Sequence, residues 1–268
     1  MLDPKSSPPL SVGRYMKAPV VTVAADAPLD EARRVFETHG ISSVVVMGPG
    51  DELVGVVSRT DLLRLADTHD SDPVLVDLED ARVMDVMTRS LVSTSPETAA
   101  HKAAAQMVAQ HSHRLYVLSE GRVVGVFGTR DAMQALVDAR VTGPLDAYMS
   151  APVLAIQYDE TVGAAIERFR ESHVSGLVVQ EGEWPVGLFT QREALEARVV
   201  SPATPVEQVM SPALLCLQHD TPIHRAAALA LATRARRVLA LQGRHVVGLS
   251  TGLDFCRALR DAAPDAEA

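Results

Sequence analysis

One sequence template occurs four times in this chain of 268 residues, and it constrains the fold more than any other feature. Each copy opens with a methionine before a short β-type run and closes with a glycine that is followed six residues later by an acidic residue. The methionine and the glycine of each copy are 38 or 39 residues apart: Met16 and Gly55, Met87 and Gly125, Met149 and Gly187, Met210 and Gly248. Four nearly equal spacings indicate an internal structural repeat.

Within the first copy the hydrophobic pattern changes its period in a defined order. Proline fits the first turn of a helix and glycine a helix end, so Pro28 and Gly40 delimit a segment with apolar residues at helical spacing. Two β-type runs around a glycine-rich turn predict a hairpin. The expected elements are a strand, a helix, two strands and a short helix over residues 20–23, 28–40, 43–47, 53–58 and 60–66.

A unit of about 55 residues buries too little surface to be stable alone, so pairing of units is expected. Residues 12–138 and 145–260 would then form two modules, each with pseudo-two-fold symmetry. Both ends of the chain are rich in proline, serine, alanine and acidic residues, which predicts disordered tails. The expected segments are a tail 1–11, repeat 1 at 12–66, an acidic linker 67–82, repeat 2 at 83–138, repeat 3 at 145–198, repeat 4 at 206–260 and a tail 261–268.

Composition excludes several classes of protein. The chain has 34 acidic and 25 basic residues and a net charge of −9, which disfavours a uniformly basic nucleic-acid binder. Its two cysteines, Cys216 and Cys256, form no Cys-x-x-Cys pair, so a disulfide scaffold and a zinc knuckle are disfavoured. No apolar run approaches the roughly 20 residues needed to span a bilayer. We therefore expect a cytoplasmic protein without membrane insertion and without a metal site.

The repeat order, the opening Met-x-x-Pro and the closing Gly-h-h-[Ser/Thr]-x-x-Asp, in which h is an apolar residue, resemble the CBS domain over nearly the whole chain. The resemblance implies an α/β (α+β) fold in which tandem CBS repeats pair into two Bateman modules. Stand-alone bacterial CBS-pair proteins and the gamma subunit of AMP-activated protein kinase have this organisation. It also implies a non-catalytic regulator that binds AMP, ADP or ATP between paired repeats and relays ligand state to a protein partner. A homodimer is expected.

The closing motif suits a nucleotide, because a carboxylate can hold a ribose diol and a hydroxyl at a helix N-terminus can meet a phosphate. By resemblance, the first site joins Val56, Ser58 and Asp61 to Leu91, Val92, Ser112, His113 and Arg114. The other complete motif implies a site made of Leu249, Thr251 and Asp254 with Leu154, Val174, Ser175 and Gly176, and with Arg236 and Arg237 placed for phosphates.

The two remaining motifs depart from the pattern. Gly128 replaces the hydroxyl residue in repeat 2, which removes a phosphate donor unless Thr129 substitutes. Glu193 replaces the aspartate in repeat 3, and its extra methylene should displace the ribose contact. One good site per module is therefore expected.

Other interpretations of the same residues stay open. Asp61 and Asp254 also stand where carboxylates cap helices. The arginines also suit ion pairs with the chain's many carboxylates, and the opening methionines suit a core. For the whole chain, the alternatives are a sensor of S-adenosylmethionine or of a dinucleotide, or a structural interaction module with lapsed sites. An enzyme is disfavoured, because no catalytic motif is present and the repeats take up the length.

Overall fold

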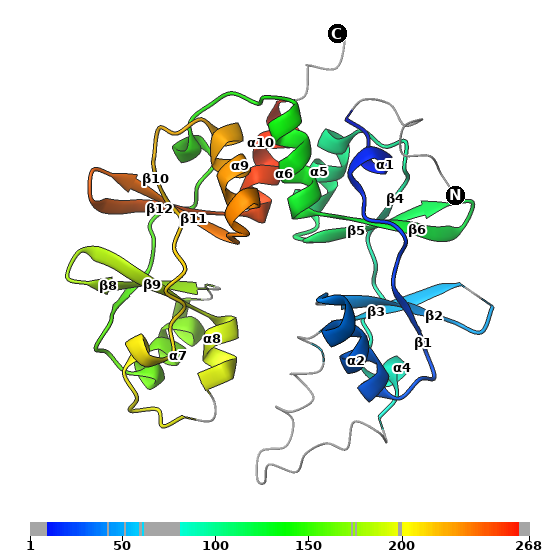
Figure 1. Cartoon of the computed structure of the whole chain (residues 1–268), viewed down its shortest axis with the longest axis horizontal. Helices are drawn as coiled ribbons and strands as arrows, with labels where there is room; N and C mark the ends of the chain where they lie inside the picture. The colour runs from blue at the N-terminus through cyan, green and yellow to red at the C-terminus, as the bar shows by residue number, and fades with distance from the viewer. Residues whose placement is uncertain are drawn as a thin grey trace. The chain divides into compact units, whose positions relative to one another are not determined.

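The computed structural model contains four three-stranded sheets in chain order (Figure 1). It describes residues 10–41, 43–50, 52–58, 61, 81–172, 174, 176–197 and 200–262. In each sheet a short first strand pairs parallel with the middle strand, which forms an antiparallel hairpin with the third. The strands are β1 Thr22–Ala24, β2 Ser43–Met47, β3 Leu53–Ser58, β4 Ser93–Thr94, β5 Arg114–Ser119, β6 Arg122–Gly128, β7 Ala155–Gln157, β8 Gly176–Glu181, β9 Trp184–Thr190, β10 Cys216–Gln218, β11 Arg237–Gln242 and β12 His245–Thr251.

Each parallel strand pair needs a crossover connection, and one helix per repeat supplies it. In repeat 1 this helix ends at Gly40, whose φ of 61° is the left-handed conformation that glycine adopts readily. Pro28 stands at the N-cap, one position before the first helical residue. The described helices are α1 Val12–Tyr15, α2 Leu29–His39, α4 Val83–Val86, α5 Ala100–Ala109, α6 Thr129–Asp138, α7 Val162–Ser172, α8 Gln191–Glu196, α9 Ile223–Thr233 and α10 Gly252–Asp261, with 3-10 turns at η2 Leu145–Ala147 and η4 Val206–Gln208.

Alternation along the strands divides the core into two layers. Val44 and Val46 of β2 point toward α2 and pack with Phe36, whereas Val45 packs against Tyr116 of the second repeat. The sheets of repeats 1 and 2 therefore face each other, with their helices on the outer sides (Figure 1). Repeats 3 and 4 share a corresponding inner layer of Val178, Leu188 and Leu239.

The repeats pair in sequence order, as the resemblance to tandem CBS repeats implied. Isolated β-bridges join repeat 1 to repeat 2, and others join repeat 3 to repeat 4. The bridges are Ser11–Ala99, Lys17–Val126, Pro28–Arg82, Val56–Thr88, Pro144–Pro222, Ser150–Leu249, Thr161–Pro205 and Leu188–Ser211. Their symmetric placement confirms two tandem pairs.

The repeat-opening methionines pack against the motif glycines of the partner repeats. A Cβ added to any of these glycines would lie within 2.6 Å of the methionine sulfur, closer than real Cβ contacts allow. The pairs are Met16 with Gly125, Met87 with Gly55, Met149 with Gly248 and Met210 with Gly187. The methionine that opens one repeat thus contacts the glycine of the closing motif in the partner repeat. The methionines therefore make a specific contact between repeats as well as filling the core.

The chain divides into two compact units, Met1–Gly128 and Thr129–Ala268. This division differs from the expected module boundary at residue 138, because α6 packs on α9 and α10. Arg130 Nη2 donates to the carbonyl of Leu231 at 3.0 Å, and a Cβ on Gly252 would lie 2.6 Å from Thr129 Oγ1. The last helix of repeat 2 is therefore part of the second unit.

The structure changes the expected boundaries of both tails. The Leu10 carbonyl accepts the Ala100 N–H at 2.7 Å, and Ser11 is 1% exposed, so neither belongs to a loose tail. Helix α10 continues to Asp261. Residues 67–80 of the linker, and the expected helix over 60–66 apart from Asp61, lie outside the described residues.

Candidate ligand-binding site

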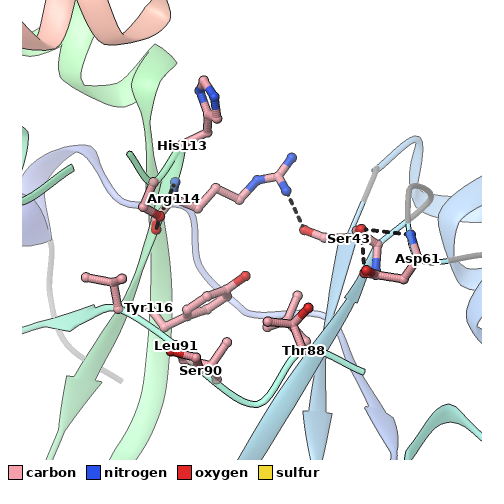
Figure 2. A pocket seen from close by; sticks show the side chains of 12 residues that line it. Ser43, Asp61, Thr88, Ser90, Leu91, His113, Arg114 and Tyr116 are labelled. Carbon is pink, nitrogen blue, oxygen red and sulfur yellow. Dashed lines mark hydrogen bonds between the residues drawn. The ribbon is translucent and has the colours of Figure 1, made fainter. Parts of the chain in front are cut away.

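A cavity of about 280 Å³ lies between repeats 1 and 2. Its walls come from the C-terminal end of β3, the N-terminal end of β5 and the segment that precedes β4 (Figure 2). The lining residues are Ser43, Val56, Ser58, Asp61, Thr88, Ser90, Leu91, Val92, Ser112, His113, Arg114 and Tyr116. All eight residues expected for the first site are brought together here, along with four others.

Asp61 accepts two hydrogen bonds from the residue three positions earlier. Its Oδ2 receives the backbone N–H of Ser58 at 2.8 Å and the Ser58 hydroxyl at 2.6 Å. In a capping box an acidic side chain makes this bond to the N-cap residue three positions earlier, which agrees with the simpler, capping interpretation of Asp61. The same bonds fix the carboxylate at the edge of the cavity, so capping and ligand contact are compatible.

Arg114 spans the two repeats. Its Nη1 donates to the Ser43 hydroxyl of β2 at 2.8 Å, as Figure 2 shows. The chain turns into β5 just before it, where the Ser112 hydroxyl donates to the Arg114 carbonyl at 2.6 Å. His113 is exposed beside it. Two basic side chains therefore enter the cavity from repeat 2, and the Arg114 guanidinium reaches across to the side of repeat 1 that carries Asp61.

Tyr116 is a lining residue that the sequence analysis missed. Burial raises the pKa of its phenol, while the positive charge of Arg114 opposes the shift. The ring packs on Val45 and Val56, and Figure 2 shows the hydroxyl pointing into the space between Arg114 and Thr88. Strand alternation could have identified it, because residues 114 and 116 of one strand share a face.

Comparison with known proteins identifies the family. The family model described as CBS domain matches residues 12–67, 83–138 and 145–200, which is more than half of the chain. The chain is a CBS-domain protein. Residues 206–260 are not among the matched ranges, yet β10, α9, β11, β12 and α10 follow there in the order of the other CBS repeats.

The chain is similar to several archaeal proteins of Methanocaldococcus jannaschii. MJ1426 is 30% identical over 149 residues, which cover 46% of this chain and 88% of that protein. MJ1404 is 23% identical over 93% of this chain but only 62% of its own length. Inosine-5′-monophosphate dehydrogenase is 29% identical over 116 residues, or 21% of its length. This chain therefore spans less than two thirds of the latter two proteins.

The solved structures support the fold. The crystal structure of MJ1225 from the same organism, proposed as an archaeal homologue of γ-AMPK, has a TM-score of 0.75 at 12% identity and covers 92% of this chain and 99% of its own. A conserved protein from Pyrococcus horikoshii has a TM-score of 0.68 at 17% identity, with 91% and 97% covered. At these identities the likeness establishes the CBS fold alone.

The complete motif of CBS repeat 4 is differently placed from that of repeat 1. Asp254 is 4% exposed and accepts the Thr251 N–H at 2.5 Å and the Thr251 hydroxyl at 2.9 Å. Its other oxygen forms an ion pair with Arg257, which also donates to the carbonyl of Tyr148 at 3.0 Å. This carboxylate is therefore bonded within the protein through both oxygens.

The remaining residues of that expected site differ in exposure. Leu154 is 37% exposed, Val174, Gly176, Leu249 and Thr251 are half-buried, and Ser175 lies outside the described residues. Arg236 is exposed.

Arg237 lies beside Gly176 and pairs in the ladder with Thr251, two residues of the site expected for it, and it also lies beside the third motif. Its Nε would lie 3.4 Å from a Cβ on Gly176, where the Thr190 side chain also approaches to 3.4 Å. Burial lowers the pKa of Arg237, and the charge of Glu193 opposes this shift. Because each motif meets the strand start of the opposite repeat, Arg237 corresponds to Arg114 and Glu193 to Asp61.

The two incomplete motifs also have defined positions. Glu193 is 7% exposed and accepts the Thr190 N–H at 3.0 Å and the Thr190 hydroxyl, so its extra methylene does not prevent capping. Gly128 is the ladder partner of Arg114, and Asp131 lies in the first turn of α6.

No described helix is both long enough and apolar enough to cross a bilayer. Within the same part of the chain, His, Cys, Asp and Glu side chains form no group of three that could hold a metal ion.

Proposed function

We propose that this CBS-domain protein is a non-catalytic regulator that binds an adenosine nucleotide, with AMP or ATP as its ligand, in the cavity between repeats 1 and 2. One observation carries the proposal: a carboxylate, two basic side chains and an apolar wall surround a single cavity. Ligand pockets generally combine an apolar lining with a few polar groups that fix orientation.

Each wall suits one part of the nucleotide. Val56, Leu91 and Val92 offer an apolar surface for the adenine ring. The Asp61 carboxylate suits the ribose diol, since it accepts hydrogen bonds only. Arg114 suits the phosphate through charge-assisted, forked hydrogen bonds, with His113 beside it. On a chain of net charge −9, an anionic ligand needs such a local positive group.

The family supports a regulatory role without catalysis. Only 21% of the inosine-5′-monophosphate dehydrogenase is matched, so that similarity does not supply an enzyme domain. Relay to a protein partner, assembly as a homodimer and a cytoplasmic location belong to the same proposal, which includes no nucleic-acid partner. Light scattering of the purified chain with and without AMP tests the homodimer directly.

Calorimetry and thermal unfolding of the full chain with AMP, ADP, ATP, S-adenosylmethionine and NADH test the ligand. A nucleotide at one hundred times its Kd should stabilise the protein by about 2.7 kcal/mol, because it binds the folded state alone. Asp61→Asn is the matched variant, since it keeps the side-chain size and removes the charge. Binding of S-adenosylmethionine or NADH alone would favour the alternative sensor. Binding of none would favour an interaction module with lapsed sites.

A further inference from the structure

The wall of the proposed nucleotide cavity includes the phenol of Tyr116. The ring packs on Val45 and Val56 and the residue is 7% exposed, so the ring belongs to the core between the two repeats. The hydroxyl points out of this core into the space between Arg114 and Thr88, as Figure 2 shows. A polar group at the end of a buried ring therefore faces the cavity.

The second unit shows that the fold does not require a phenol at this position. Leu239 occupies the equivalent place and pairs with Leu249. Tyr116 pairs with Val126, and both of these partners directly follow a motif glycine. Leu239 is 1% exposed and fills the inner layer of its unit with an apolar side chain. The hydroxyl of Tyr116 is thus a property of the first cavity.

Donor and acceptor capacity around Ser43 directs the phenol hydrogen toward the cavity. The Ser43 hydroxyl accepts Arg114 Nη1 at 2.8 Å, because a guanidinium only donates. Burial raises the pKa of Tyr116, against the charge of Arg114 and a hydrogen bond from Ser43, so the phenol stays protonated at neutral pH. With the phenol oxygen accepting from Ser43, the phenol O–H remains to donate to a group in the cavity.

Two donors of different kinds then lie close together at the place proposed for the phosphate. Arg114 offers charged N–H groups, and Tyr116 offers a neutral O–H from the same strand. A phosphate oxygen has enough lone pairs to accept from both. Its bond to the phenol is also stronger than the bond of a neutral hydroxyl, because the acceptor carries charge.

We propose that Tyr116 is a specificity-determining residue, whose phenol donates a hydrogen bond to the phosphate of the nucleotide in the first cavity. The inference rests on the proposed function and adds a second phosphate donor at the same site.

The test is titration of the full-length protein with AMP and with adenosine by calorimetry, in Tyr116→Phe and in the control Tyr158→Phe. The first variant keeps the buried ring and removes only the hydroxyl. We expect AMP affinity to fall about five- to twentyfold and adenosine affinity to change less than about threefold. Tyr158 packs in the core of the second unit, so its variant should change neither affinity.

Two further variants separate a ligand contact from indirect effects. Ser43 connects Tyr116 to Arg114, so Tyr116→Phe is repeated in a Ser43→Ala background. A direct contact should still lower AMP affinity there, and disappearance of the effect would mean that Tyr116 only positions Arg114. Tyr116→Leu introduces the residue type found at this position in the second unit and should show the same loss of AMP affinity, which guards against a folding defect of one variant.

Unchanged AMP affinity in Tyr116→Phe, or equal losses for AMP and adenosine, would overturn the inference while nucleotide binding stands. Failure of the unaltered protein to bind AMP would overturn the proposed function, and this inference with it.

Discussion

The motifs of repeats 1 and 4 have the same sequence pattern but different surroundings. In the first unit, Asp61 is half-buried at the edge of a cavity and faces basic residues of repeat 2. In the second unit, Asp254 is 4% exposed and forms an ion pair with Arg257 of its own helix. In both units the carboxylate accepts a hydrogen bond from the hydroxyl of the residue three positions earlier.

This difference shows that the motif by itself specifies a local hydrogen-bond pattern, which precedes a described helix at Thr190 and at Thr251. Ser58 with Asp61, Thr190 with Glu193 and Thr251 with Asp254 all form the cap, including the pair with the longer carboxylate. What makes one of them a candidate site is the opposite repeat. A basic side chain on the neighbouring helical turn, such as Arg257, is enough to hold the carboxylate within the protein.

The largest expected effect concerns the methionine–glycine contact, which both units share. Gly55→Ala and Gly248→Ala should each destabilise the fold by up to about 3 kcal/mol, because the added methyl group would overlap Met87 or Met149. Urea unfolding measures the loss. Gly176→Ala is the control, since its Cβ would meet neighbours only at 3.4 Å. Equal losses in all three variants would contradict a specific contact.

The next effect separates the two aspartates by affinity. Asp61→Ala should weaken AMP binding roughly ten- to a hundredfold, since hydrogen bonds to a charged group are worth about 1.5–3 kcal/mol. Asp254→Ala should leave this binding unchanged, because its carboxylate is directed to Arg257. Calorimetry on both variants measures the contrast. A larger loss of AMP affinity in Asp254→Ala than in Asp61→Ala would contradict the assignment of the nucleotide to the first cavity.

The same pair should differ in stability in the opposite sense. Asp254→Ala removes a cap and the ion-pair partner of a half-buried arginine, for a loss of about 2 kcal/mol. Asp61→Ala should lose only the cap, about 1 kcal/mol. Denaturant unfolding at fixed pH and salt compares them. Asp254→Asn, which keeps a capping oxygen, should lie between Asp254→Ala and the unaltered protein.

The arginines give a smaller contrast. Arg114→Ala should lower AMP affinity about tenfold and leave adenosine affinity nearly unchanged, with the AMP effect decreasing at high salt. Arg237→Ala should not change binding at the first cavity, because it lies against Gly176 in the second unit. Equal losses for AMP and adenosine in Arg114→Ala would show that Arg114 shapes the cavity without binding phosphate.

The smallest expected effect concerns the third strand of repeat 4. Ser250 is fully buried, and its hydroxyl has no hydrogen-bond partner within the described residues. Val57, Phe127 and Phe189 occupy the equivalent core positions of the other repeats. Ser250→Ala should therefore raise the free energy of unfolding by about 1 kcal/mol. A loss of stability would show that the hydroxyl is bonded in solution.

The sequence by itself determined the four repeats and their order of strands and helices, and its resemblance to the CBS domain implied the eight residues that line the first cavity. Periodicity and turn residues act over a few positions, so they can be identified without knowledge of the partner repeat. The position of Gly40 at a helix end follows from the same local arguments, and the resemblance implied that neighbouring repeats pair.

Only the tertiary structure decided which residues meet across the repeats. Tyr116 joins the cavity, Arg237 faces the third motif, Asp254 binds Arg257, and α6 packs on α9 and α10. Each of these results depends on which side chains of different repeats approach one another. The spacing of residues along one repeat does not predict these contacts. Burial and side-chain bonds then decide whether a carboxylate faces a cavity or is bonded within the protein, because a buried charge is stable only with a partner.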